Sequence, residues 1–215
     1  MLRLAAIALA WLAYFALHSV LAATAVKAWV ARRWPQFMPG YRIMFNFVSM
    51  VTLIPVLWLV YGVAGDWLWQ WQGIRAWLAN GLALTAILGL AAAGTDYDMG
   101  EFVGLRQLVR RDADHAERFR VSRLHRFVRH PWYCVGLVLI WTRDMNGPLL
   151  VSALMITAYF VIGSKLEEDK LLESYGETYR RYMTKVPGLI PLPWKYLTAA
   201  EAAELMQRPA TSRGR

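Results

Sequence analysis

The sequence predicts an all-α integral membrane protein of about five transmembrane helices, including a C-terminal helical hairpin, with a cytoplasmic helical cap. Three observations predict this fold class. Hydrophobic residues make up 57% of the chain, above the roughly 45–50% expected of a soluble domain. They gather in runs long enough to cross a hydrocarbon core of about 30 Å as helices. The basic residues, which give a formal net charge of +9, lie mainly at the ends of these runs, as is typical of membrane flanks.

Three long apolar runs are expected to form the N-terminal spans. They cover Leu4 to Ala25, Ile43 to Ala64 and Arg75 to Ala93, and each has about the 20 residues that a membrane-crossing helix needs. The first run also resembles a signal peptide, but further long apolar runs follow it, so we expect an uncleaved span. Pro55 is expected to kink the second span, because proline removes a helix hydrogen bond.

Two shorter apolar runs follow, from Tyr133 to Trp141 and from Leu149 to Ile162, and TRDMNGP separates them. Asn, Gly and Pro in succession are strong turn formers. The two runs are therefore expected to form a helical hairpin that dips through the bilayer and returns, which brings the number of spans to five.

Polar segments divide the chain into four parts. Residues 1–95 hold the three N-terminal transmembrane helices, 96–128 form a cytoplasmic connecting segment, 129–193 hold the hairpin and a C-terminal module, and 194–215 are a tail. Lys and Arg are concentrated in the segments after the first, third and last spans. The positive-inside rule therefore places these segments in the cytoplasm and the amino terminus outside.

Composition also bounds the partners. Cys134 is the only cysteine, so the chain has no internal disulfide framework and no cysteine cluster for zinc. Because the basic residues flank apolar runs, we expect the lipid bilayer as a partner and no nucleic acid. No metal site is predicted, because Glu167 and Glu168 point to different helix faces, and His125 and His130 are five residues apart. The sequence predicts no oligomeric state.

Side chains suited to chemistry gather in the two polar segments that flank the hairpin. These are His125, Arg129, His130, Tyr133, Glu167, Glu168, Tyr175, Tyr179 and Tyr182. We expect a helix to begin at Glu167 and run to about Tyr182. An acidic first turn suits the positive end of a helix dipole, so capping and ligand binding both remain open for the two glutamates.

His18 lies in the first apolar run, near its expected cytoplasmic end. An ionisable group inside a membrane segment is a functional candidate. The alternative is a histidine that is simply hydrogen-bonded by a neighbouring helix.

Several motifs of the C-terminal half occur together in order. RHPWYCVG is followed, after the hairpin, by EED and then by YGETYRRYMTKVPGLIPLP. Over roughly residues 120 to 193 this pattern resembles the isoprenylcysteine carboxyl methyltransferase superfamily of integral membrane methyltransferases. Upstream, FALHSVLAATAVKAW, YRIMFNFVSMVTLIP and DMGEFVGLRQL resemble its NnrU-type branch, which includes methanethiol S-methyltransferases.

The resemblance implies that residues 129–193 bind S-adenosylmethionine at the cytoplasmic face of a bacterial inner membrane. It implies that His130, Pro131, Trp132 and Tyr133 contact the cofactor and that Glu167 binds its ribose or amino-acid part. We also expect His125, Arg129 and Tyr179 to belong to the cofactor-binding site. His18 and His125 are the candidates for catalysis, by assisting deprotonation of the methyl acceptor. Aromatic faces and carboxylates suit a cationic sulfonium, whereas the cofactor's own carboxylate suits Arg129 or a histidine.

The chain departs from the superfamily pattern at three positions. Arg123 and His125 replace a glycine and a tyrosine before the Arg-His-Pro motif, and Gly163 stands where the prenylcysteine enzymes have an arginine for the acceptor's carboxylate. An ionised acceptor would be costly to bury there without a cation. We therefore expect a small thiol or an uncharged lipophile as the acceptor.

Two alternatives remain open at this point. Sterol reductases share a similar C-terminal module, so a membrane reductase that binds a nicotinamide cofactor is one. The NnrU likeness suggests the other, a non-enzymatic accessory protein of nitrogen-oxide respiration, which would bind neither cofactor.

Overall fold

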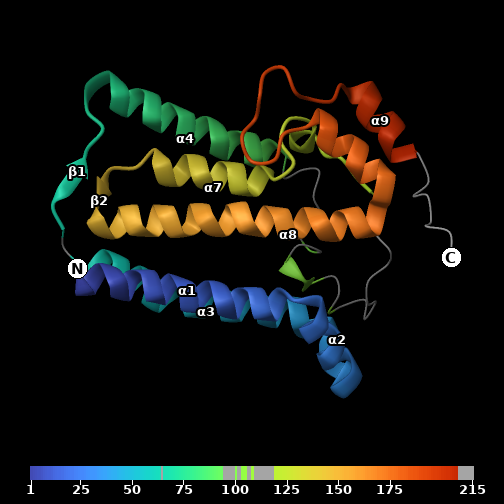
Figure 1. Cartoon of the computed structure of the whole chain (residues 1–215), viewed down its shortest axis with the longest axis horizontal. Helices are drawn as coiled ribbons and strands as arrows, with labels where there is room; N and C mark the ends of the chain where they lie inside the picture. The colour runs from blue at the N-terminus through green and yellow to red at the C-terminus, as the bar shows by residue number, and fades with distance from the viewer. Residues whose placement is uncertain (64, 94–99, 101–102, 106–107, 109–118, 208–215) are drawn as a thin grey trace. The chain divides into compact units, whose positions relative to one another are not determined.

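The structure is a computed structural model that describes residues 1–63, 65–93, 100, 103–105, 108 and 119–207. Its elements, in chain order, are α1 (Leu2–Ala22), α2 (Thr24–Arg33), η1 (Pro35–Gly40), α3 (Tyr41–Gly62), β1 (Trp67–Trp69), α4 (Gly73–Ala93), η3 (Leu124–Arg126), α7 (Pro131–Trp141), β2 (Met145–Asn146), α8 (Gly147–Lys185) and α9 (Ala199–Gln207) (Figure 1). Most of the connecting segment expected at 96–128 lies outside the described residues.

Helices long and apolar enough to cross a membrane number four in the described part of the chain. They are α1, the segment Pro35–Gly62 that joins η1 to α3, α4 and α8. Large apolar side chains on α3 are exposed: Phe47 by 66%, Ile54 by 64% and Trp58 by 80%. Exposed apolar surface on this scale suits lipid and not water. The predicted all-α integral membrane fold is therefore confirmed, and α3 continues as one helix through Pro55.

The hairpin has one short arm. α7 has 11 residues, so it is about 16 Å long and covers about half of a hydrocarbon core. The second predicted arm, Leu149 to Ile162, is the first part of the 39-residue helix α8.

The expectation that a separate helix begins at Glu167 is wrong, because α8 is already helical there. Lys165 and Leu166 are good helix formers and no proline intervenes, so nothing ends the helix between the apolar and the charged run. Gly176, with φ 54° and ψ −125°, interrupts α8 near its end. This left-handed backbone favours glycine.

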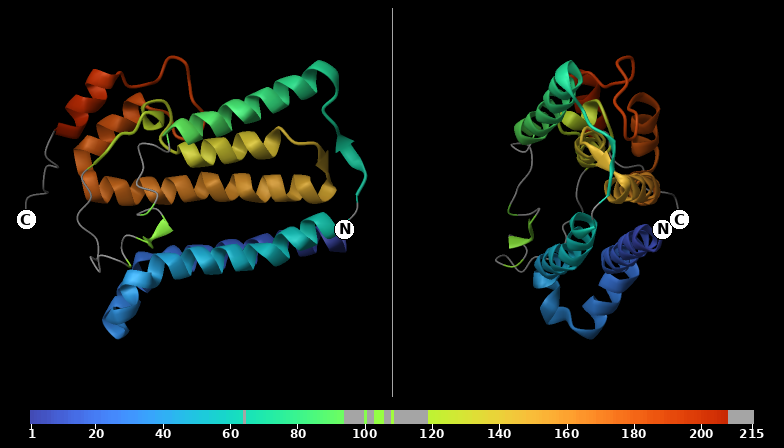
Figure 2. Two further views of the ribbon diagram at one scale, coloured as in Figure 1. Left: turned by 180° about the vertical axis from the view of Figure 1, so that it is seen from behind. Right: turned by 90° about the vertical axis from the view of Figure 1, so that its left-hand side faces the viewer.

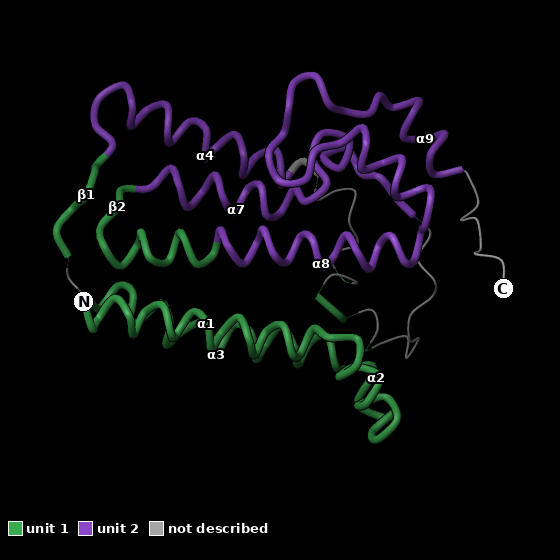
Figure 3. The backbone as a smooth tube through the Cα atoms, viewed as in Figure 1, with its two compact units in different colours: residues 1–70, 97–116, 144–156 green, residues 71–96, 117–143, 157–215 purple. Residues whose placement is uncertain are grey.

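Two compact units interleave along the sequence (Figure 3). Unit 1 comprises residues 1–70, 97–116 and 144–156, and unit 2 comprises residues 71–96, 117–143 and 157–215.

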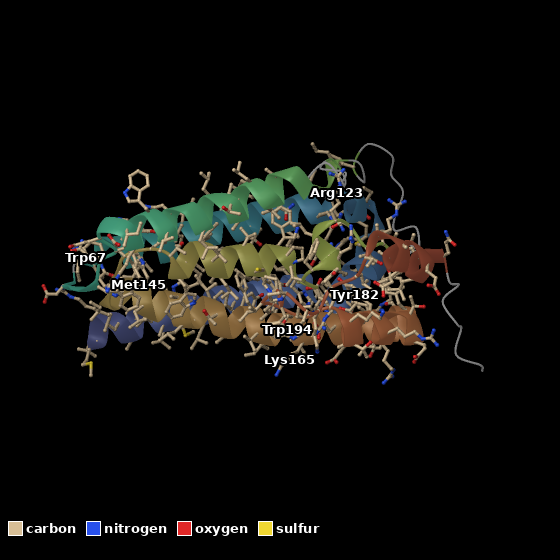
Figure 4. The ribbon with its side chains drawn as sticks, turned by 90° about the horizontal axis from the view of Figure 1, so that it is seen from above. Trp67, Arg123, Met145, Lys165, Tyr182 and Trp194 are labelled. Carbon is tan, nitrogen blue, oxygen red and sulfur yellow. The ribbon has the colours of Figure 1, made fainter. Side chains whose placement is uncertain are left out.

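In unit 1, α1 and α3 lie side by side (Figure 2). Their shared core consists of Ile7, Trp11, Val56 and Val60. The Trp11 indole N–H donates a hydrogen bond of 2.9 Å to Ser152 Oγ. At one end of the unit, β1 and β2 pair antiparallel, which brings Trp67 and Met145 to the same end (Figure 4).

In unit 2, α7 packs between α4 and α8 (Figure 1). The Trp141 indole N–H donates a 3.0 Å hydrogen bond to Thr157 Oγ1, which joins α7 to α8. The end of α8 and α9 enclose a separate buried core of Val121, Tyr179, Tyr182, Val186, Leu197, Ala202 and Leu205. This core fixes the polar end of α8 against the segment that leads into α7.

Candidate functional site

The candidate site begins at the entry to α7. His130 occupies the N-cap position with an extended backbone (φ −121°, ψ 72°), and Pro131 follows at the first helical position. Proline disfavours a helical conformation at the preceding residue and is well suited to a helix start. The backbone N–H groups before the helix are paired with the segment after α8. Arg129 N–H donates to Pro187 O at 2.8 Å, and His130 N–H donates to Gly188 O at 3.1 Å. The segment after α8 is thereby fixed beside the Arg-His-Pro motif.

Arg129 joins this entry to α8 through its side chain. Its Nε and Nη2 both lie 2.8 Å from Glu168 Oε1, and the two side chains are 12% and 11% exposed. Nη1 donates to Met183 O at 3.1 Å and also to Val186 O. Because the last carbonyls of a helix have no partner within the helix, Arg129 caps the end of α8 while it neutralises Glu168.

His130 lies between two carboxylates. Its Nε2 is 2.9 Å from Glu168 Oε1, and its Nδ1 is 3.5 Å from Glu167 Oε2. Burial of the imidazole acts to lower its pKa, but hydrogen bonds to Glu167 and Glu168 outweigh burial and hold the pKa above the ordinary value. With an acceptor on each side, both ring nitrogens act as donors, so the protonated form is favoured.

Tyr133 extends the site along α7. Its ring stacks on His130, with centroids 5.4 Å apart, and on Phe160 of α8, with centroids 4.7 Å apart. Its hydroxyl donates a 3.3 Å hydrogen bond to Glu167 Oε2. A Cβ at Gly136 would come within 2.8 Å of the Phe160 ring, so glycine there makes room for this aromatic stack.

His125 is held by a hydroxyl on each of two other segments. Its Nδ1 is 2.8 Å from Ser122 Oγ, and its backbone carbonyl accepts a 2.6 Å hydrogen bond from the Tyr182 hydroxyl. Burial, with a smaller contribution from the neighbouring charge of His130, lowers the pKa of His125 to about 4. The imidazole is therefore neutral near pH 7 and only a weak base.

The structure brings most of the sequence-predicted residues together in unit 2. Tyr179 is 2% exposed within the buried core, Pro131 is buried, and Trp132 is 39% exposed. His18 belongs to unit 1, where its Nδ1 lies 3.1 Å from Ser49 Oγ and its ring contacts Phe45. The catalytic and cofactor-binding roles of these residues remain predictions.

Sequence reasoning gave Glu168 less weight than Glu167, whereas the structure makes Glu168 the more buried of the two. Both glutamates reach His130 although they point to different helix faces, because the imidazole presents a nitrogen on each of two edges. The signal was present in the sequence: an Arg-His pair and a Glu-Glu pair are complementary in charge and number.

The raised pKa of His130 predicts a pH dependence of stability. A group whose pKa is higher in the folded state stabilises the fold below its unfolded value of 6.5 and loses this contribution as the pH rises through the folded value. The unfolding temperature of the detergent-solubilised protein should therefore fall as the pH is raised above about 6.5. His130→Asn should remove this dependence, whereas His125→Asn should leave it in place. An identical alkaline decline in His130→Asn and wild type would contradict the protonated assignment.

These features define the class first: an integral membrane protein with a charged cluster at the entry of a short apolar helix. The NnrU protein family model matches residues 6–144, and the chain belongs to this family. The matched range includes Arg129, His130 and Tyr133 but ends before the two glutamates. No solved structure matches the chain.

Several relatives share the name methanethiol S-methyltransferase. Methanethiol S-methyltransferase 2 of Bradyrhizobium diazoefficiens is 32% identical over 180 residues, which is 81% of this chain and 68% of the relative. The enzyme of Pseudomonas deceptionensis is 32% identical over 191 residues, with 81% and 67% covered. That of Mycobacterium tuberculosis is 32% identical over 194 residues, with 83% and 74% covered. The predicted NnrU and methanethiol S-methyltransferase-like branch is thereby confirmed.

Proposed function

We propose that this protein is an S-adenosylmethionine-dependent methyltransferase that acts on a small thiol or an uncharged lipophile. The observation that carries the proposal is the cluster of Arg129, His130, Glu167 and Glu168. It lies in a chain whose relatives, aligned over about four fifths of it, are named methanethiol S-methyltransferases.

The cluster fits a zwitterionic, cationic cofactor. Glu167 can accept further hydrogen bonds, because its side chain is 50% exposed. Its contacts to His130, at 3.5 Å, and to Tyr133, at 3.3 Å, are also long. It would accept hydrogen bonds from a ribose hydroxyl or an ammonium group. The Tyr133 ring is stacked on His130 and Phe160, so Tyr133 would contribute to the site through its hydroxyl beside Glu167. Arg129 and Glu168 Oε1 are already bound to each other, and they also contact the end of α8 and His130 respectively, so we assign these two residues to positioning His130 and the end of α8.

S-adenosylmethionine supplies an electrophilic methyl group when bound. The side chains of this chain then have to hold the donor and acceptor in line and exclude water, which can supply much of the rate enhancement of such a transfer. His130 is held protonated by its two carboxylates, and His125 is a weak base with a pKa of about 4. Proton removal by either histidine therefore contributes little, and water is the simplest acceptor for the proton that a thiol loses.

The site is proposed to face the cytoplasm of a bacterial inner membrane. The proposal rests on the Lys and Arg content of the segments after the first, third and last spans, and it agrees with the supply of a water-soluble methyl donor inside the cell.

The test is an assay with labelled S-adenosylmethionine and a panel of thiols and neutral lipophiles. Wild-type protein in inside-out vesicles should methylate a thiol without added detergent, because a charged donor does not cross a sealed membrane. Glu167→Gln should weaken binding of S-adenosylmethionine by about 1.5 to 3 kcal/mol, the usual worth of a hydrogen bond to a charged group. Glu173→Gln, an exposed site on the same helix, is the matched control and should change little.

Other outcomes contradict the proposal. Binding of a nicotinamide cofactor with no binding of S-adenosylmethionine would favour a reductase. Binding of neither would favour an accessory protein. Equal binding by Glu167→Gln and wild type would remove Glu167 from the site.

A further inference from the structure

Unit 2 contains an open, largely apolar cavity of about 640 Å³ beside the charged cluster. It lies between α4, α7 and the segment that follows α8. Its lining comes from one face of α4, one face of α7, Thr157 of α8 and residues 189–191. A volume of this size is in the range of sites for ligands of tens of atoms, whereas methanethiol has two non-hydrogen atoms.

Two residues of the cavity wall, Cys134 and Leu189, are next to backbone groups that hydrogen-bond to His130. Cys134 lies one helical turn after His130, and its N–H donates to His130 O at 3.0 Å. Leu189, also in the wall, directly follows Gly188, whose carbonyl accepts the His130 N–H. The cavity wall on α7 is thus the continuation of the helix face that begins at His130.

The far end of the cavity has a different character. Trp71 precedes α4, Arg75 lies in its first turn, and Trp141 is the last residue of α7. The Trp71 indole N–H donates to Arg143 O at 3.2 Å, which fixes this end. Among the lining residues Arg75 is the charged one, and tryptophan and arginine at a helix end are typical of the membrane interface. Between the two ends, the α4 and α7 walls are formed by Leu78, Ala79, Leu82, Leu137 and Val138.

We propose that this cavity is the acceptor chamber and that it takes an uncharged thiol with a linear apolar chain. The proposal rests on the proposed methyltransferase function and names its acceptor class. The sulfur lies at the Cys134 and Leu189 end, next to the cluster, and the chain extends toward Trp71 and Trp141. Apolar walls suit such a chain, and burying an ionised group along them would be costly.

The transfer balances without a further reactant. The thiol proton goes to water, and the thiolate sulfur forms a bond to the methyl carbon. The bond between that carbon and the sulfonium sulfur breaks, and its electron pair stays on the donor sulfur. The products are an alkyl methyl sulfide and S-adenosylhomocysteine.

The first test measures kcat/KM for methanethiol, butanethiol and octanethiol. Ala79→Phe places a ring in the middle of the cavity, and it should lower the value for octanethiol by about tenfold or more, the usual scale of discrimination by an apolar pocket. It should change the value for methanethiol less than about twofold by the same steric argument. Leu84→Phe, on an exposed part of α4 outside the cavity, is the matched control and should affect neither. Equal losses for all three thiols, or wild-type preference for methanethiol, would overturn the proposal.

The second test needs no turnover, so it separates this proposal from the methyltransferase assignment. Cys134 is the only cysteine in the chain and lines the cavity, so its alkylation by N-ethylmaleimide reports access to the chamber. Decyl methyl sulfide, a product-like ligand, should slow this labelling several-fold in wild type and in Leu84→Phe but not in Ala79→Phe. Absent labelling of the free protein, or labelling that the sulfide leaves unchanged, would overturn the chamber. If the sulfide protects Cys134 from alkylation but the protein methylates no thiol, the result would support the chamber and contradict only the proposed function.

Discussion

Glu168→Gln should lower the free energy of unfolding by about 3 to 5 kcal/mol, the range observed when one partner of a buried ion pair is removed. Glu168 Oε1 accepts hydrogen bonds from both Arg129 and His130, and its side chain is 11% exposed. Glutamine has nearly the same shape, so the change removes the charge and leaves two cationic groups without their closest anion. Equilibrium unfolding in mixed detergent micelles would measure the effect.

The control for this prediction is Glu173→Gln on the same helix. Glu173 is exposed, and surface substitutions of this kind usually change stability by less than about 0.5 kcal/mol. The alkaline decline of the unfolding temperature should also be weaker in Glu168→Gln, because this carboxylate holds up the pKa of His130 together with Glu167. Equal stability of the two variants would show that Glu168 does not hold the site together.

Arg129→Lys should cost about 2 to 3 kcal/mol of unfolding free energy, although the charge is kept. The guanidinium contacts Glu168 with two nitrogens and the carbonyls of Met183 and Val186 with a third. An ammonium is a single point and cannot reach all of these groups, so at least one buried acceptor is left without a donor, at a cost of about 1 to 3 kcal/mol. Arg180→Lys, at an exposed ion pair with Glu177, is the matched control.

A double-mutant cycle sharpens both predictions. Because Arg129 and Glu168 are in direct contact, the effects of Arg129→Lys and Glu168→Gln should not add, and the double variant should lose less stability than the sum of the single losses. Additive losses would show that the two side chains act independently.

Part of the cluster of Arg129, His130, Glu167 and Glu168 could be predicted from the sequence. The sequence indicated that the segment around Arg129 and His130 and the segment around Glu167 belong together, through charge and through motif order. It indicated the wrong start for the helix that carries the glutamates, because an acidic turn after an apolar run resembles a capped helix start. No helix-ending residue separates the two runs, so α8 passes from apolar to charged without a break. His125 and Tyr179 could not be placed from local pattern, because their contacts are distant in the chain: His125 O accepts from the Tyr182 hydroxyl, and Tyr179 packs against Phe119.

What the sequence determined by itself is the medium and the class. Apolar runs of about 20 residues set the membrane-crossing helices, because backbone polar groups in lipid must be satisfied within the helix itself, and the ordered motifs were sufficient to indicate the family. Only the tertiary structure decided which carboxylate anchors the site and where an apolar cavity adjoins it. The partners of Arg129 and His130 are contributed by α8 and by the segment after it. Such contacts depend on how helices pack and where each side chain is desolvated, which no local spacing in the sequence encodes.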